Sequence, residues 1–425
     1  MNSTMNCTFP YPFQPNPYPP SNLICTAGST EFQINTDTGG GSSSVASLSN
    51  GGFVVVWFSN NVYGQLYSST GAIVGSEFQV NSASLYTNSV AAVAGLSNGG
   101  FAVVWGGYEG GGIYGQMYIN EGTAVGSEFQ VNTDTYQDSM PTVTALSNGG
   151  FVIVWQASYY NIHGQIYSST GERVGSEISG GTAFTDTNPA VAGLNNGDFV
   201  VLCLEQYGVG IVYGQVFSNK GTVAGSPFGA VGLAVAGLSN GGFIVVGQEA
   251  GNIYGQMYNN KGTAVGSGFQ VNTDTGVDID PSVASLSDGG FVVVWNSNNV
   301  YGQIYNSTGD VVRSEFQVNA DTCQDSMPAV AGLTSGGFVV VWEGCNNGNI
   351  YGQIYDSTGE KGAPAPPPST VSLCNMPEQC YNSASQGTYN LATQIVIPIN
   401  TDFCQVSSQV CASPLTTHQS QYTAK

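Results

Sequence analysis

The chain has 425 residues and a formal net charge of −21, from 6 Lys and Arg against 27 Asp and Glu. Nucleic-acid binding needs a basic surface stripe, so this charge excludes nucleic acid as a partner and argues against an anionic membrane surface. Only 8% of the residues are charged, so the surface must be largely Ser, Thr, Asn, Gln, Gly and Tyr, as suits a secreted protein that is glycosylated or packed in an assembly.

Residues 1–30 form an arm rich in proline and aromatic residues. The segment 9–20 reads Phe-Pro-Tyr-Pro-Phe-Gln-Pro-Asn-Pro-Tyr-Pro-Pro, and it is expected to be extended because each proline fixes φ and removes a hydrogen-bond donor. Residues 1–10 lack the basic start and apolar core of a signal peptide, so we expect the numbering to begin at a mature end. The sequence contains no run of about 18 apolar residues, so it does not predict insertion into a membrane.

The stretch Gly-Gly-Phe-Val-Val-Val-Trp, first seen at 51–57, occurs in seven copies, some of them varied, at steps of 44 to 50 residues. The seven copies have their Phe at Phe53, Phe101, Phe151, Phe199, Phe243, Phe291 and Phe338. All five tryptophans stand four residues after this Phe, and Cys203 and Gly247 take that place in the other two copies. A fixed period in the forties indicates a repeat architecture.

Each copy contains four short extended pieces, which in the first copy span 44–48, 53–57, 62–67 and 76–80. Ser-Asn-Gly-Gly connects the first two pieces and Ser-Thr-Gly connects the last two, because these residues tolerate the positive φ of tight hairpins. Four antiparallel strands in each of seven copies predict an all-β, seven-bladed β-propeller. The alternative, a β-solenoid, has shorter coils. The uniformly apolar second strand also favours blades buried on both faces.

The repeat register predicts how the ring closes. The fourth-strand motif first occurs at 31–35, before any other part of a repeat, and the seventh copy stops after its third strand at 350–355. The strand at 31–35 is therefore expected to complete the last blade. The predicted domains are an N-terminal arm at 1–30, a propeller at 31–362, and a Pro-rich linker with a C-terminal arm at 363–425.

Aspartates recur in the links that follow the fourth strands, at Asp37, Asp134, Asp274 and Asp321. Oxygen ligands in a loop could bind calcium, and the best cluster would be Asp274, Asp278 and Asp280. One carboxylate per link is too few for a site, and no Asp-x-Asp-x-Asp-Gly loop is present. We therefore favour Asx turns at the strand ends, and we expect no metal and no cofactor.

Three sequons predict N-glycosylation at Asn2, Asn6 and Asn306. The first two lie in the N-terminal arm. The third, Asn-Ser-Thr-Gly, falls in a turn between the third and fourth strands of the sixth copy, and it is expected to be exposed.

The C-terminal arm contains a segment that matches a strand of the repeat. Residues 394–402 read Gln-Ile-Val-Ile-Pro-Ile-Asn-Thr-Asp, and their end repeats Ile-Asn-Thr-Asp of 34–37. The segment resembles an eighth fourth strand, which could add to a neighbouring copy. Its apolar residues are Ile395, Val396, Ile397 and Ile399.

Nine cysteines divide into three groups. Cys203 is expected to act as an apolar core filler. Cys323 and Cys345 fall in loops on the same face of the predicted ring, so we expect a disulfide between them. The remaining six lie in the arms and allow fifteen pairings, within or between chains; they are Cys7, Cys25, Cys374, Cys380, Cys404 and Cys411. This pattern predicts an oxidising, extracellular location.

The sequence does not predict an enzyme. Its two histidines are His163, where other copies have Tyr, and His418 in the C-terminal arm. The glutamates near the loops after the second strands could supply paired carboxylates for glycoside hydrolysis, but we favour the role of solvated loop charge for them. These are Glu109, Glu205, Glu249 and Glu343.

Over residues 31–362 the motifs Gly-Gly-Phe-Val-Val-Val-Trp, Ile-Tyr-Gly-Gln and Gly-Ser-Glu-Phe-Gln-Val-Asn resemble the propeller-type repeats of large secreted and cell-surface proteins of microbes. The resemblance implies a cell-surface or extracellular protein. We expect a structural subunit of a homopolymeric filament or sheath, in which the arms link neighbouring rings by strand addition and disulfides. The alternative is a glycan-binding lectin or adhesin that uses loop tyrosines, namely Tyr108, Tyr159, Tyr160 and Tyr207.

Overall fold

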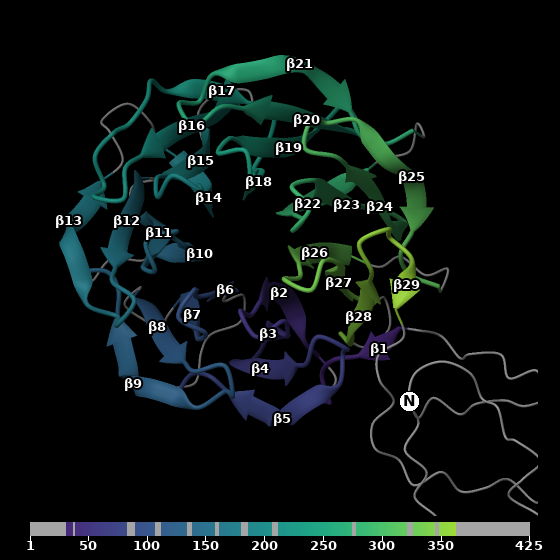
Figure 1. The fold of residues 1–425 in the computed structure, drawn as a ribbon. Coiled ribbons are helices and arrows are strands. Elements are labelled where there is room, and N and C mark those ends of the chain that lie inside the picture. The colour runs from purple at the N-terminus through teal and green to yellow at the C-terminus, as the bar shows by residue number, and fades with distance from the viewer. Residues whose placement is uncertain are drawn as a thin grey trace, which may run out of the picture. The chain divides into compact units, whose positions relative to one another are not determined.

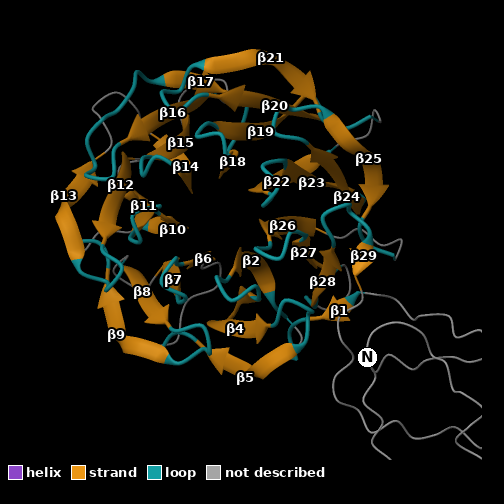
Figure 2. Ribbon diagram, viewed as in Figure 1, coloured by secondary structure: helices purple, strands orange, loops and turns teal. Residues whose placement is uncertain are grey.

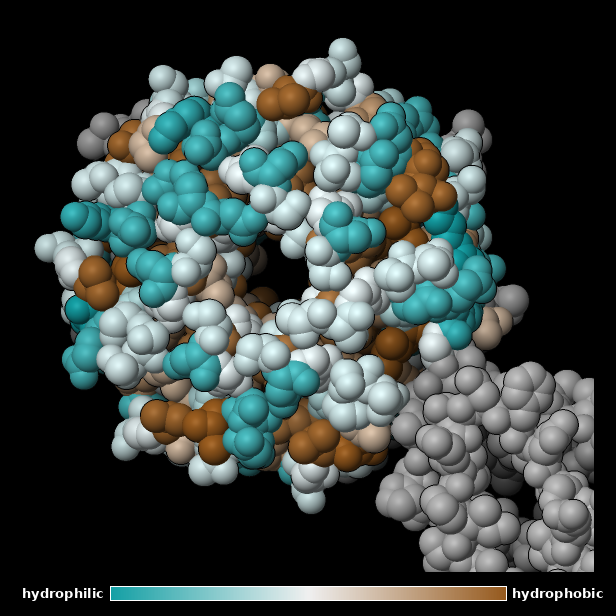
Figure 3. All heavy atoms as spheres, viewed as in Figure 1, coloured by the Kyte–Doolittle hydropathy of each residue, from teal (hydrophilic) through white to brown (hydrophobic). Residues whose placement is uncertain are grey.

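The computed structural model describes residues 31–362, apart from 37–38, 83–89, 107–111, 134–137, 158–160, 180–185, 206–210, 274–277, 321–325 and 345–347. In this part of the chain the strands form seven antiparallel sheets, each a blade of a ring (Figures 1 and 2). The space-filling view shows an opening at the centre of the ring, the channel (Figure 3). The predicted seven-bladed β-propeller is confirmed. No helix among these residues is long and apolar enough to cross a membrane.

The blades follow one another in chain order, and each runs from the channel to the rim. Blade 1 comprises β2 (Gly41–Ser47), β3 (Phe53–Ser59), β4 (Asn61–Tyr67) and β5 (Ile73–Gln79). Blade 2 comprises β6 (Ala91–Gly95), β7 (Phe101–Gly106), β8 (Ile113–Tyr118) and β9 (Ala124–Gln130). Blade 3 comprises β10 (Ser139–Ala145), β11 (Phe151–Ala157), β12 (Asn161–Tyr167) and β13 (Arg173–Ser179). Blade 4 comprises β14 (Asp186–Gly193), β15 (Phe199–Glu205), β16 (Val212–Phe217) and β17 (Phe228–Ala230).

The second half of the ring repeats this order. Blade 5 comprises β18 (Ala234–Gly237), β19 (Phe243–Glu249), β20 (Asn252–Tyr258) and β21 (Ala264–Gln270). Blade 6 comprises β22 (Ile279–Ser285), β23 (Phe291–Ser297), β24 (Asn299–Tyr305) and β25 (Val311–Gln317). Blade 7 comprises β26 (Ser326–Gly332), β27 (Phe338–Glu343) and β28 (Ile350–Tyr355), and its rim is formed by β1 (Phe32–Gln33) and β29 (Lys361–Gly362).

The second strand of a blade is buried on both faces, as its composition predicts. In β3, Phe53, Val55 and Trp57 pack in a core shared with blade 7. Val54 and Val56, which alternate with them, pack in the core shared with blade 2. Successive side chains of a strand point to opposite faces, so a blade stacked between two neighbours needs apolar residues at every position.

An aromatic layer explains the glycine of the recurring Tyr-Gly-Gln motif. Phe53 stacks on Tyr67 within blade 1, with ring centroids 4.8 Å apart and planes at 10°. Phe78 of β5 reaches the next blade, 5.3 Å from the Tyr118 ring. Its ring lies over Gly64, where an added Cβ would stand 2.7 Å from it. Glycine is therefore required where the outer-strand phenylalanine crosses the third strand.

Polar residues of the outer strand join neighbouring blades. Asn81 of blade 1 is 3% exposed, and its Oδ1 accepts a hydrogen bond of 2.7 Å from the Val62 N–H. The residue after such an asparagine bonds to the next blade: the Thr273 hydroxyl donates to Glu315 Oε2 at 2.8 Å. In the motif Glu-Phe-Gln-Val-Asn-Thr, the asparagine thus bonds to its own blade and the threonine bonds to the following blade.

Gly247, which replaces tryptophan in blade 5, has a steric cause. The step from Phe199 to Phe243 is 44 residues, shorter than the other steps of the repeat. The short link between β17 and β18 runs over this position, because a Cβ on Gly247 would lie 2.0 Å from the Val231 carbonyl oxygen and 2.4 Å from Gly232 Cα. The link occupies the place of the missing indole.

Cys203 packs against the core between blades 3 and 4 but is only partly buried. We expected a buried core position. The thiol covers less of the blade interface than the indole that stands there in five copies, and the neighbouring Val201 is also partly buried. Its Sγ lies 3.8 Å from the Tyr213 carbonyl oxygen.

Candidate assembly site

The rim of blade 7 is formed by two separate pieces of chain. Phe32 pairs with Gly352 and Gln33 with Tyr351, as predicted for a closing N-terminal strand. Lys361 and Gly362 pair with Tyr355 and Ile354. In blade 1 one continuous strand makes the corresponding pairs, with Ile73 and Val74 at its start and Phe78 and Gln79 at its end. The sequence analysis missed the contribution of β29.

The register places the two ends of the ring close together. Gly362 stands at the position of Val74, and Glu31 precedes Phe32 as Glu77 precedes Phe78. Only the positions of Gly75 and Ser76 separate the two pieces along this strand. The described ends of the ring, β1 and β29, therefore lie next to each other on the rim of blade 7 (Figure 1).

The N-terminal piece is anchored by apolar contacts on two blades. Phe32 lies over Gly352, where an added Cβ would stand 2.8 Å from its ring. The same ring lies 5.3 Å from Tyr67 of blade 1. Ile34 is 4% exposed, and its N–H donates to the Ile350 carbonyl at 2.8 Å.

Polar contacts complete this anchor. Asn35 Oδ1 accepts a hydrogen bond of 2.8 Å from the Ile350 N–H, and Asn35 Nδ2 donates to the Gly348 carbonyl at 3.2 Å. The Thr36 N–H and hydroxyl both donate to Glu77 Oε2 of blade 1, at 3.1 and 2.9 Å. Residues 32–36 thus contact blade 7 and blade 1 at the same time.

The C-terminal piece is held by blade 6. Lys361 Nζ donates to the Val318 carbonyl at 2.7 Å, and burial lowers the pKa of this ammonium group. Just before it, Glu360 accepts a hydrogen bond of 3.2 Å from Arg313 Nη1. Arg313 also lies over the Phe316 ring, 4.7 Å from its centroid. Two of the six basic residues of the chain therefore lie at the seam, the part of the blade 7 rim where β1 and β29 meet.

An apolar belt lies on the rim of the other blades. It consists of side chains in the first part of the outer strands or just before it, each 38–64% exposed: Ile73, Val125, Val174, Val223, Val265 and Val312. Figure 3 shows hydrophobic groups around the rim of the ring. In blade 7 the place of Ile73 and Val74 is taken by Lys361 and Gly362, which interrupts the belt at the seam.

The structure places the sequon of Asn306 in a turn between β24 and β25, as expected. Ser307 and Thr308 are exposed, and Asn306 is half-buried. Its Oδ1 accepts from the Thr308 and Asp310 N–H groups, each at 2.9 Å, so this asparagine also caps the hairpin. Hydrogen bonds from Thr308 and Asn306 lower the pKa of the exposed Asp310. Glycosylation at this site stays a prediction.

The calcium candidate is only partly described. Asp278 is fully buried, and its N–H donates to the Gly251 carbonyl at 3.0 Å. Asp280 is exposed and has a φ of 52°, whereas Asp274 lies outside the described residues. Among the residues that the structure describes, no group of three His, Cys, Asp or Glu side chains could hold a metal ion.

Other predicted site residues lie outside the described part of the chain. They are the sequons at Asn2 and Asn6, the disulfide candidates Cys7, Cys25, Cys323, Cys345, Cys374, Cys380, Cys404 and Cys411, the assembly residues Ile395, Val396, Ile397 and Ile399, and the tyrosines Tyr108, Tyr159, Tyr160 and Tyr207. These assignments stay predictions.

His163 has a structural partner. Its Nδ1 lies 2.6 Å from Glu177 Oε1, and Glu177 Oε2 accepts a hydrogen bond of 3.0 Å from the Thr133 hydroxyl. The imidazole therefore takes part in the contact between blades 2 and 3. In other blades the outer-strand glutamate bonds to a threonine of the preceding blade in the same way, as Glu77 and Glu315 do. Nearby, the Trp155 indole N–H donates to the buried Asp138 carboxylate at 2.9 Å.

A ring of left-handed residues at the inner strands was missed by the sequence analysis. Ser42, Met140, Asn188, Asp280 and Met327 all have φ between 49° and 52°, and each sits where the pairing of the inner strand shifts register. Four of them precede a proline, although a proline favours an extended conformation with negative φ in the residue before it. A left-handed conformation is strained for a residue other than glycine, and this strain is repeated at the inner strands of five blades.

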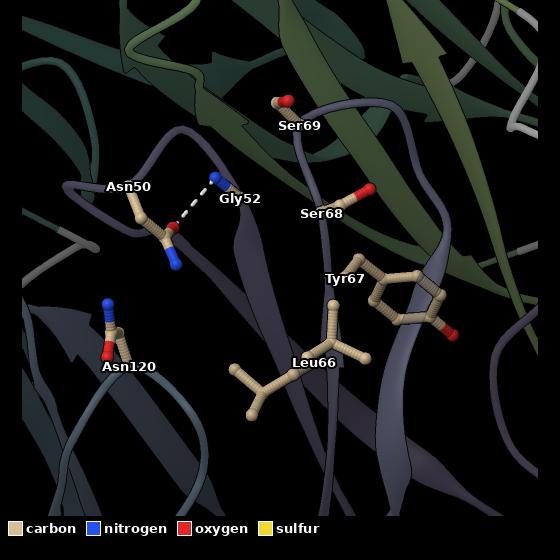
Figure 4. Close-up of a pocket in the computed structure, with 8 residues that line it drawn as sticks. Asn50, Gly52, Leu66, Tyr67, Ser68, Ser69 and Asn120 are labelled. Carbon is tan, nitrogen blue, oxygen red and sulfur yellow. Dashed lines mark hydrogen bonds between the residues drawn. The ribbon is translucent and has the colours of Figure 1, made fainter.

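The described residues also line two small cavities. One of about 150 Å³ lies between hairpin turns of blades 1 and 2, where Leu66 and Tyr67 lie beside Asn50 and Asn120 (Figure 4). It is smaller than the roughly 300–1,000 Å³ of typical ligand pockets. The other, of about 320 Å³, is bounded by inner strands of blades 3 to 6, and none of the residues that line it is ionisable.

No known family model matches the chain, and no curated protein matches it. Solved structures similar to it include a fungal alcohol oxidase of the AA5 family in complex with copper, with 14% identity, TM-score 0.49, and coverage of 79% of this chain and 78% of that one. The Dos1 propeller is similar at 11% identity and TM-score 0.47, covering 72% of this chain and 76% of that one.

The alpha-L-arabinofuranosidase Arb93A from Fusarium graminearum is similar at 10% identity and TM-score 0.45, covering 77% of this chain and 97% of that one. These likenesses, all at TM-scores below 0.5, carry no argument about activity. The propeller fold alone does not settle whether this chain is an enzyme, because propellers host many unrelated functions.

Proposed function

We propose that this chain is an extracellular structural protein, the subunit of a homopolymeric filament or surface sheath of a microbial cell. The propeller is a rigid bead, and the arms at 1–30 and 363–425 link each bead to its neighbours. Contacts that join one patch to a different patch on the next copy propagate without closing, so one pair of arms per ring is sufficient for a polymer.

The observation that carries this proposal is the split rim of blade 7. Both arms join the ring within two strand positions of each other, at β1 and β29. Six of the nine cysteines belong to these arms. A single point of attachment on the rim, supplied with cysteines on both arms, suits covalent linkage between neighbouring copies.

The composition of the ring agrees with this role. Its surface carries few charges, and an apolar belt follows the outer strands of six blades. Exposed outer strands are templates for pairing with another chain. Within the described residues no cluster of metal-binding side chains is present, and no ionisable residue lines the cavity of about 320 Å³ at the inner strands. The proposal therefore rests on the arms and the rim.

The test is deletion of residues 363–425 from the full chain. The truncated protein is expected to remain folded and monomeric under conditions in which the full chain polymerises, as judged by circular dichroism and light scattering. Polymers of unchanged mass from the truncated chain would refute the proposal. Binding of a monomeric full chain to a glycan array would favour the lectin or adhesin instead.

A further inference from the structure

The seam of blade 7 defines a short recognition sequence, position by position. The place of Phe32 takes an apolar side chain over a glycine of the third strand, and Ile178 fills the same place in blade 3. The place of Ile34 is buried. The place of Asn35 bonds to the Ile350 N–H, and that of Thr36 bonds to Glu77.

The place of Gln33 has a different requirement. The Ile34 N–H donates to the Ile350 carbonyl, and donors that face the partner alternate along an antiparallel pair. The N–H of Gln33 therefore points away from β28, toward the outside of the sheet. A proline, which has no N–H, fits an edge position of this kind and would prevent a further strand from adding there.

Residues 397–401 of the C-terminal arm satisfy each requirement. They read Ile-Pro-Ile-Asn-Thr, in register with Phe-Gln-Ile-Asn-Thr of 32–36. Isoleucine replaces the phenylalanine as it does in blade 3, and proline falls at the position whose N–H faces outward. The Ile-Asn-Thr that follows is identical to the anchor of β1 and its flanking residues.

We infer that residues 397–401 of one copy occupy the place of residues 32–36 on β28 of a second copy. This inference rests on the proposed polymer and names its joint. The strand to be displaced makes two ladder pairs with β28, where the continuous outer strand of blade 1 makes four with its neighbour, and the arriving strand would replace its contacts with the same kind of contact. The 34 residues between Gly362 and Ile397 can span up to roughly 110 Å when extended, so the arm can reach a neighbouring ring.

Photo-cross-linking in the full chain tests the joint directly. Ile397→p-benzoylphenylalanine places a photoreactive ring where Phe32 contacts Gly352 and Tyr67. Copies labelled with heavy and light isotopes are mixed, assembled and irradiated, and the cross-linked peptides are sequenced by mass spectrometry. Heavy–light cross-links from position 397 to peptides that contain Tyr67 or residues 350–355 are expected.

The outcomes separate this inference from the proposed function. Polymers that cross-link elsewhere, or cross-links confined to single copies, would overturn the joint and leave the structural role standing. Absence of polymers would overturn both.

A matched pair of full-length variants tests the register. Ile399→Asp puts a charge at the buried place of Ile34, so at least a tenfold loss of polymer is expected. Thr393→Asp puts the same charge in the C-terminal arm outside residues 394–402, and it should polymerise like the parent chain. Equal losses in the two variants would contradict the register and overturn the inference.

Discussion

The Ile350 N–H donates to the Asn35 side chain across 315 residues of sequence, at a distance of 2.8 Å. In four other blades the same bond joins residues 19 apart, as in Val62 and Asn81. The hydrogen bond that holds an outer strand to its own blade in blade 1 thus connects the two ends of the ring in blade 7. The ring is closed by hydrogen bonds and packing where the chain itself is discontinuous.

Asn35→Ala is therefore expected to weaken the closure. The variant leaves the buried Ile350 N–H without its acceptor, which costs about 1–3 kcal/mol of the free energy of unfolding. Thermal unfolding should show the loss, and limited proteolysis should cut near residues 31–36. Asn81→Ala removes the same bond inside a continuous strand and should lose similar stability without that cleavage. A wild-type melting temperature for Asn35→Ala would contradict this role.

The glycine of the third strand should be required only under a phenylalanine. Gly64→Ala brings a Cβ to 2.7 Å from the Phe78 ring, and such overpacking costs about 1–3 kcal/mol. Gly164→Ala is the matched control, because Ile178 stands in the phenylalanine's place and the nearest atom is 3.4 Å away. We expect it to be neutral or slightly stabilising. Equal denaturation midpoints for the two variants would argue against the ring-over-glycine contact.

Gly247 should tolerate no side chain. Gly247→Ala places a Cβ 2.0 Å from the Val231 carbonyl oxygen, and a backbone atom cannot move aside cheaply, so a loss of about 3 kcal/mol or more is expected. Gly229→Ala, in the same region, meets no atom within 4 Å and should unfold like the parent chain in urea. A stable Gly247→Ala or Gly247→Trp variant would show that the link does not fill this space.

The blade tyrosines predict loss of stability at alkaline pH. Burial raises the pKa of Tyr167 to about 12, and it also raises the pKa values of Tyr67, Tyr118, Tyr305 and Tyr355. The unfolded chain releases these protons near pH 10, so the stabilisation is complete below pH 10 and is lost as the pH rises through the folded values. Absorbance at 295 nm should rise cooperatively with unfolding above pH 10. Gradual ionisation of all tyrosines in the folded ring would contradict this.

The repeat made most of the fold predictable. A period in the forties, four extended pieces per copy and an early fourth-strand motif were sufficient for the ring and for the N-terminal strand that closes it. The strand at Lys361 and Gly362 could not be predicted, because its residues differ from Ile73 and Val74, which hold the same positions in blade 1. Its place is set by its neighbour β28 and by the Val318 carbonyl of blade 6.

The candidate site was harder to predict because it depends on contacts between blades. The sequence predicts that the tail segment mimics a fourth strand, a prediction outside the described residues, and the bonds of Asn35 and Thr36 show what Ile-Asn-Thr does at the rim of blade 7. Gly247 looked like the loss of a tryptophan, whereas the shortened link makes glycine necessary. In both cases residues distant in sequence determine the role of the local motif.

The disulfide between Cys323 and Cys345 is a prediction from the strand order alone. Cleavage with cyanogen bromide and trypsin, which separates Cys345 from Cys374 at Lys361, should yield one linked peptide pair that contains Cys323 and Cys345, and reduction should separate it. Peptides that remain separate without reductant would contradict this pairing.

The most direct test of the structural role is the mass distribution of the native full-length protein, measured by mass photometry with and without reductant. Polymers many times the 44.1 kDa of one chain are expected, and their mass should fall on reduction if cysteines of the arms join neighbouring copies. A single species at the mass of one chain under both conditions would contradict a filament or sheath built from this propeller.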